Sequence, residues 1–99
     1  MVRAKELVCE AAIKDVLANN CPSSHYQING FCDDCACIQK TSSGWEVFNG
    51  RRGQKEGIAV FTNVVEACLE LIRRLAYDEQ EVFSWSEAFL SAIVGDNVA

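Results

Sequence analysis

The sequence predicts an α+β domain, in which an N-terminal helix and two C-terminal helices pack on a small antiparallel sheet of three or four strands. Three observations predict this class. Apolar residues recur with a helical period near both ends of the chain, they alternate with a period of two in the middle, and turn-forming residues gather where the period changes. The 99 residues are enough for one core, so we expect a single domain over residues 1–99.

The first expected element is a helix over residues 2–18. Its apolar positions form two adjacent rows at i, i+4 spacing, and its charged residues lie mostly on the opposite face. Asn19 and Asn20 tolerate the left-handed backbone that ends many helices, and Pro22 disfavours helical backbone at Cys21. We therefore expect the helix to end before Pro22 and a loop to follow.

The middle of the chain predicts the strands. They are expected at Tyr26–Ile28, Cys35–Lys40, Trp45–Asn49 and Ile58–Phe61. Asn29-Gly30 and residues 41–44 are turn signals, and residues 50–57 are interpreted as a glycine-rich polar loop. The last strand is apolar throughout, which predicts a strand that is central or covered on both faces.

A helix is expected directly after the sheet. Thr62 or Asn63 is its N-terminal cap, and its apolar face includes Val65, Cys68 and Ile72. Trp45, on the third strand, is expected to belong to the core that this helix covers.

The last helix is expected to follow an acidic connector over residues 77–83. Ser84-x-x-Glu87 has the spacing of a capping box, which opens a helix by satisfying backbone N–H groups. Gly95 is interpreted as the residue that ends it.

The charge is distributed unevenly along the chain. Residues 1–75 contain as many basic as acidic residues, so the formal net charge of −5 lies entirely in residues 76–99. Nucleic acids and anionic membranes repel such a surface, and we expect neither as a partner. The acidic segment also contains Tyr77, Phe83 and Trp85, and aromatic residues among charges of one sign are typical of surfaces that bind proteins of the opposite charge. In the alternative interpretation, Phe83 and Trp85 cover the sheet and the acids only face water.

The candidate binding residues follow from this pattern and from one acidic pair earlier in the chain. They are Tyr77, Asp78, Glu79, Glu81, Trp85, Asp33 and Asp34. Two adjacent carboxylates such as Asp33 and Asp34 could also bind a hard cation, but they are more typical of a turn.

Six cysteines in a chain of this length need an explanation. The N-terminus shows no secretory pattern, so we expect reduced, mostly buried thiols and no disulfide. Cys9 and Cys68 lie on predicted apolar stripes, where a thiol packs as a small hydrophobe. Cys32-x2-Cys35-x-Cys37 is the one cluster with metal-like spacing, and it supports an alternative function as a small zinc-binding or thiol-redox regulator, with Cys21 and His25 as further ligand candidates.

The motifs of catalysis are missing from the sequence. His25 is the single histidine, so every Ser-His-Asp or Cys-His arrangement would depend on it. It follows Pro22-Ser23-Ser24, a predicted loop in which a solvated imidazole is the simpler interpretation. We expect no catalytic residue, no cofactor and no resident metal.

The stretch from Tyr26 to Leu75 resembles a known family, the small immunity proteins of bacterial polymorphic-toxin and contact-dependent growth inhibition systems. The resemblance depends on an ordered set of short motifs, namely Tyr26-x-Ile28, Cys37-Ile38-x-Lys40, Trp45-x-Val47-Phe48, Arg52-Gly53, Phe61 and Glu66-Ala67-Cys68. The chain departs from the family pattern by placing Arg51 where an acid often precedes Arg-Gly. The matched part covers about half of the chain and excludes the first and last helices.

The resemblance implies a non-catalytic antidote that binds one cognate secreted toxin in the bacterial cytosol and neutralises it. Many such toxins are basic nucleases, and the acidic surplus of this chain would speed its association with a basic partner. The free protein is expected to be a monomer or a weak dimer.

Overall fold

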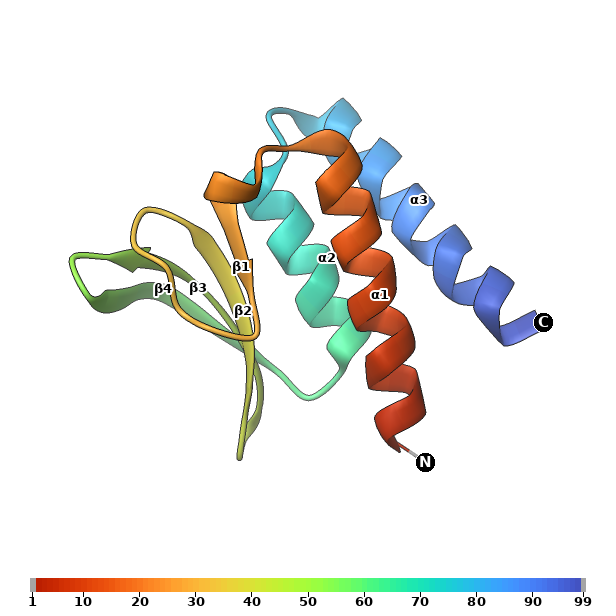
Figure 1. Cartoon of the computed structure of the whole chain (residues 1–99), viewed down its shortest axis with the longest axis horizontal. Coiled ribbons are helices and arrows are strands. Elements are labelled where there is room, and N and C mark those ends of the chain that lie inside the picture. The colour runs from red at the N-terminus through yellow and green to blue at the C-terminus, as the bar shows by residue number, and fades with distance from the viewer. Residues whose placement is uncertain (1, 99) are drawn as a thin grey trace.

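The computed structural model describes residues 2–98 and has three layers (Figure 1). Its elements are α1 (Val2–Asn20), the short 3-10 helix η1 (Ser23–His25), β1 (Tyr26–Ile28), β2 (Ala36–Thr41), β3 (Gly44–Arg51), β4 (Gln54–Phe61), α2 (Val64–Leu75) and α3 (Glu79–Val98). The sheet forms one outer layer, α1 and α2 cover one of its faces, and α3 packs on the other side of these two helices (Figure 1). The α+β class with one N-terminal and two C-terminal helices is confirmed.

Helix α1 ends where the asparagines predict. The Asn20 side-chain amide donates to the Val16 carbonyl at 2.7 Å, and the Cys21 backbone N–H donates to the Leu17 carbonyl at 2.9 Å. These two bonds satisfy carbonyls that lack partners at a helix C-terminus. Pro22 then directs the chain into η1 and towards the sheet.

The sheet has the order β1-β2-β3-β4 and is mixed. The β2–β3 hairpin is antiparallel, with Ile38 opposite Val47, as expected. The short strand β1 runs parallel to β2, so antiparallel pairing was wrong for this one strand. The reason is local: Asn29 takes a φ of 68° and donates its backbone N–H to the Ile38 carbonyl at 2.8 Å, which starts a crossing loop where Asn29-Gly30 predicted a tight turn.

The crossing loop, residues 29–35, packs on the face of the sheet that the helices leave open, which we call the far face. Phe31 stacks on Phe48 with ring centroids 6.0 Å apart, and Cys35 and Cys37 are buried beside Phe48 in a small second core. The loop is held at its end by Gly50, which donates its backbone N–H to the Cys35 carbonyl and accepts from the Asp34 backbone N–H.

The polar stretch predicted as a loop over residues 50–57 is a β-hairpin. β3 continues to Arg51, β4 begins at Gln54, and the two-residue turn between them has φ values of 52° at Arg52 and 77° at Gly53. Positive φ at both turn residues matches the right-handed twist of the flanking strands. The loop prediction was wrong because residues 50–57 show no alternation of apolar and polar positions, the usual sign of a strand. The turn geometry, with positive φ at both residues, specifies the hairpin instead.

This turn yields a stability prediction. Arg52 holds a left-handed conformation that is unfavourable for a residue with a long side chain, whereas asparagine tolerates it. We expect Arg52→Asn to raise the free energy of unfolding by about 0.5–1 kcal/mol in urea denaturation. Equal or lower stability would show that the Arg52 side chain makes a compensating contact.

Strand β4 is the edge of the sheet, which corrects the expectation of a central or doubly covered strand. Ile58 and Val60 are 50% and 54% exposed on the far face. Ala59 and Phe61, the alternate residues, face the helices and are partly buried. β4 is therefore apolar on both faces but covered on only one.

Helix α2 begins at the predicted cap. The Asn63 side chain accepts a hydrogen bond from the Val65 backbone N–H at 2.8 Å. At the other end Arg74 donates to Glu70 at 2.9 Å and to the Gly57 carbonyl of β4 at 2.6 Å. This arginine therefore joins the C-terminal turn of α2 to the edge strand, where Gly57 has a φ of 59°.

Helix α3 begins one and a half turns earlier than predicted. Asp78 accepts the Glu81 backbone N–H at 2.9 Å, and the Glu81 carboxylate accepts the Tyr77 backbone N–H at 2.7 Å. These reciprocal bonds cap the helix with the x-x-Glu spacing that Ser84 was expected to provide. Glu79 and Glu81, which were expected to lie in a connector, are therefore in the first turn of α3. Gly95 was expected to end the helix, but α3 continues past it to Val98.

The main core lies between the sheet, α1 and α2, and α3 extends it. Trp45 is 8% exposed and belongs to this core, which confirms its prediction. Cys9 and Cys68 are buried in the same cluster, as their positions on apolar stripes predict. α3 contributes Trp85, Phe89 and Ile93.

Candidate protein-binding surface

The helix α3 has apolar residues on two sides. Trp85, Phe89 and Ile93 face α1 and α2 and are buried. A second row, made of Phe83, Leu90 and Val94, lies outside this buried side of the helix, and its side chains are 66%, 41% and 59% exposed. We call this row the outer row of α3.

Acidic residues surround the outer row. Glu79 and Glu87 are exposed on α3, and neither has an ion-pair partner among the residues that the structure describes. Asp78 and Glu81 are partly committed to the helix cap. Acids at a helix N-terminus also interact favourably with the helix dipole, so this cluster stabilises α3 while it gives the surface its charge.

Tyr77 and Trp85, the two aromatic candidates, have opposite surroundings. Tyr77 precedes the cap of α3 and is 91% exposed, so its ring is open to a partner. Trp85 is 6% exposed in the main core and is not available at the surface. Tyr77, Asp78 and Glu79 thus form one exposed segment, with Glu81 half-buried beside it and Trp85 in the core.

Asp33 and Asp34 belong to a different part of the molecule. They lie in the crossing loop on the sheet, while α3 lies beyond the α1–α2 layer (Figure 1). Asp33 accepts the Gly53 backbone N–H at 2.8 Å and so fixes the β3–β4 turn against the loop. Asp34 has a φ of 59°. Their contacts are those of a turn, which was the alternative to a cation site.

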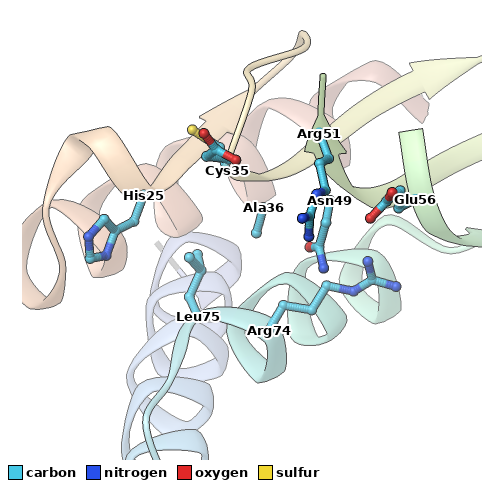
Figure 2. A pocket seen from close by; sticks show the side chains of 10 residues that line it. His25, Cys35, Ala36, Asn49, Arg51, Glu56, Arg74 and Leu75 are labelled. Carbon is cyan, nitrogen blue, oxygen red and sulfur yellow. The ribbon is translucent and has the colours of Figure 1, made fainter. Parts of the chain in front are cut away.

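A hollow of about 460 Å³ lies between η1, the sheet and the end of α2 (Figure 2). His25 lies at one end of it, and Arg51, Glu56 and Arg74 lie at the other. Arg74 is already bonded to Glu70 and Gly57. Because the charges in the hollow are mixed and the Arg74 guanidinium is already bonded, the hollow favours no particular ligand charge.

Cys32, Cys35 and Cys37 lie together in the second core, where two of the thiols donate hydrogen bonds to backbone carbonyls. The Cys35 thiol donates to the Ser24 carbonyl at 3.1 Å, and the Cys37 thiol donates to the Cys32 carbonyl at 3.6 Å. Burial, together with the neighbouring Cys32, raises the pKa of Cys35 to about 12. The thiolate is the nucleophile in thiol exchange, so this burial disfavours exchange at Cys35 at neutral pH. Within residues 2–98, no group of three or more His, Cys, Asp and Glu residues is arranged to hold a metal ion.

This burial predicts how the six thiols react. Cys9, Cys35, Cys37 and Cys68 are buried, and burial raises the pKa of each. We expect all six thiols to titrate in fresh denatured protein, and these four to react slowly in native protein at neutral pH. A count below six in denaturant would contradict the reduced state.

Cys68 offers a matched stability test. It is buried against α1, and burial raises its pKa to about 12. We expect Cys68→Ser to lower the free energy of unfolding by about 1–3 kcal/mol, because a hydroxyl replaces a buried sulfur. Cys68→Ala is the control, since it removes the sulfur without adding a polar group.

Comparisons with known protein families, with curated proteins and with solved structures found no match to this chain. Across the described residues, no helix is both long enough and apolar enough to cross a membrane.

Proposed function

We propose that the protein is a non-catalytic immunity protein of the bacterial cytosol that binds a cognate secreted toxin, a basic nuclease, and neutralises it. The observation that supports this most directly is the combination of exposed aromatic residues and unpaired acids at the start of α3. Tyr77 and Phe83 are largely exposed, with Glu79 and Glu87 on the same helix. Buried aromatic anchors supply most of the affinity of protein interfaces, and charge of one sign speeds association with a partner of the other.

The motif resemblance supports the same proposal. Its matched positions Trp45, Val47, Cys68 and Ile72 are buried and build the core between sheet and helices. The proposal therefore assigns these positions to stability and assigns binding to α3, which the motifs do not cover.

The decisive experiment uses the neighbouring upstream gene. If it encodes a large secreted protein, its C-terminal domain should form a 1:1 complex with this chain, and coexpression should restore growth to cells that produce the domain. Isothermal titration calorimetry should give a Kd of about 1 nM or below. A toxic domain that neither binds this chain nor loses toxicity in its presence would contradict the proposal.

The charge of α3 makes a separate kinetic prediction. The structure shows that Asp78 and Glu81 cap α3, so reversing them would damage the helix as well as the charge. We expect Glu79→Lys with Glu87→Lys to slow association with a basic toxin about 3- to 10-fold at low salt. Glu79 lies in the first turn of α3, so its reversal should also lower the free energy of unfolding by about 1 kcal/mol, which leaves the domain folded.

The salt dependence identifies the cause. Exposed charges more than about 8 Å apart are largely screened at physiological ionic strength, so the difference in association rate should shrink as salt rises. An association rate unaffected by both substitutions at low salt would remove α3 from the interface.

A further inference from the structure

The outer row of α3 is a set of three exposed apolar side chains that lie along a single helix. Phe83, Leu90 and Val94 are spaced i, i+7 and i+11, which places them on one side of the helix. At 1.5 Å per residue the row is about 16 Å long. Single exposed apolar residues are common and need no explanation, but a straight row on a helix that already buries another face does.

Among the residues that the structure describes, none covers this row, whose side chains are 66%, 41% and 59% exposed. α3 packs against α1 and α2 through Trp85, Phe89 and Ile93, so its place in the domain does not depend on the outer row. Phe83, Leu90 and Val94 can therefore be changed without opening the core.

The charges around the row select among possible occupants. Residues 76–99 contain five acidic residues and no Lys or Arg. A second copy of the chain docking through α3 would bring like charges together, which is unfavourable. A basic partner gains from the same charges, and a straight apolar row at i, i+7 and i+11 fits the ridge-and-groove packing of a second helix.

We propose that the outer row of α3 binds a basic amphipathic helix of the partner protein, with apolar residues on Phe83, Leu90 and Val94 and with Lys or Arg beside Glu79 and Glu87. This inference rests on the proposed function, because it names the kind of surface that the toxin presents. It goes beyond that function in predicting a helix-to-helix contact.

The test uses a defined probe. The probe is a synthetic helical peptide of Leu and Lys with Leu at i, i+3, i+4 and i+7, and its control is a scrambled peptide of the same composition. Amide chemical-shift mapping of the whole chain should show the largest changes along α3, and fluorescence anisotropy gives the affinities. The scrambled peptide should bind about tenfold more weakly, because it has the charge but no continuous apolar face.

Matched variants locate the contact. Phe83→Ala with Leu90→Ala should weaken peptide binding at least about tenfold, as loss of two anchors does at other interfaces. Ile58→Ala with Val60→Ala is the control, since these side chains are exposed to a similar degree on β4, across the α1–α2 layer (Figure 1). Unchanged unfolding temperatures in both pairs would show that the fold is intact.

Three results would overturn the proposal: shifts centred on β4, equal losses in the two variant pairs, or equal binding of the scrambled peptide. A dimer of the free protein that Leu90→Ala dissociates would also overturn it, because the row would then bind a second copy of the chain.

Measurements with the toxin distinguish a failure of the helix contact from a failure of the proposed function. If the chain neutralises it and the Phe83/Leu90 variant does so with unchanged affinity, the helix contact is wrong and the function stands. If the peptide binds along α3 but no toxin complex forms, only the function fails.

Discussion

Replacing Trp45 with alanine is expected to lower the free energy of unfolding by about 3–5 kcal/mol. Trp45 lies on β3 in the main core, opposite Phe61 of β4 and Lys40 of β2, and is 8% exposed. Its removal leaves a cavity that the neighbouring strands cannot close. Domains of this size are stable by about 5–15 kcal/mol, so the variant should be partly unfolded near physiological temperature.

Urea denaturation monitored by far-ultraviolet circular dichroism measures this loss. Trp45→Phe is the control, because it keeps an aromatic ring in the core and should cost less. A Trp45→Ala protein that folds normally and loses only its binding would instead assign Trp45 to the interface.

Replacing Gly50 with alanine is expected to destabilise the domain by at least about 3 kcal/mol. A Cβ atom on Gly50 would overlap the Cys32 carbonyl oxygen, a backbone atom that cannot rotate away. The crossing loop would have to separate from β3, which breaks the two backbone hydrogen bonds of Gly50 with Asp34 and Cys35. Phe31 and Cys32 would then move away from the second core and expose Cys37 and Phe48 to solvent.

Gly95→Ala is the matched control. Gly95 lies inside α3, and a Cβ atom there would meet nothing within 4 Å. Alanine favours helix, so this variant should be more stable by about 0.5–1 kcal/mol, with both glycine variants measured by the same urea denaturation. Similar stability of Gly50→Ala and the wild type would mean that the crossing loop does not pack on β3 as described.

The parts of the fold that were predictable are those with strong local signals. The β2–β3 hairpin has a turn sequence between two alternating runs, and α2 has Asn63 as its cap, so local chemistry and tertiary structure agree. The second hairpin was missed because β3 is polar where it ends and β4 is polar where it begins, and the deciding feature is positive φ at Arg52 and Gly53. The parallel pairing of β1 follows from Asn29, which starts the crossing loop where a tight turn was expected. Phe31 then packs this loop on Phe48, a contact between residues far apart in the sequence.

The candidate surface was predictable only in part. The charge of residues 76–99 and the aromatic residues among them pointed to α3. Trp85 was assigned to the surface because an acid-rich segment gives no direct sign of which aromatic faces the core. The outer row was missed because the helix was expected to start at Ser84, which excludes Phe83. Once Asp78 is recognised as the cap, the spacing of Phe83, Leu90 and Val94 shows the row in the sequence itself.

The bond from Arg74 to the Gly57 carbonyl has a consequence for solubility. An exposed edge strand is a template on which other chains can add strands, and uninterrupted apolar edges are typical sites of aggregation. β4 is such an edge, with Ile58 and Val60 uncovered. The positive φ of Gly57 bends the strand near its middle, and Arg74 occupies a carbonyl that an incoming strand would need. The uninterrupted part of the edge shrinks to residues 58–61, which is shorter than the roughly six-residue segments typical of fibril-forming strands, so this edge is a poor template for an added strand.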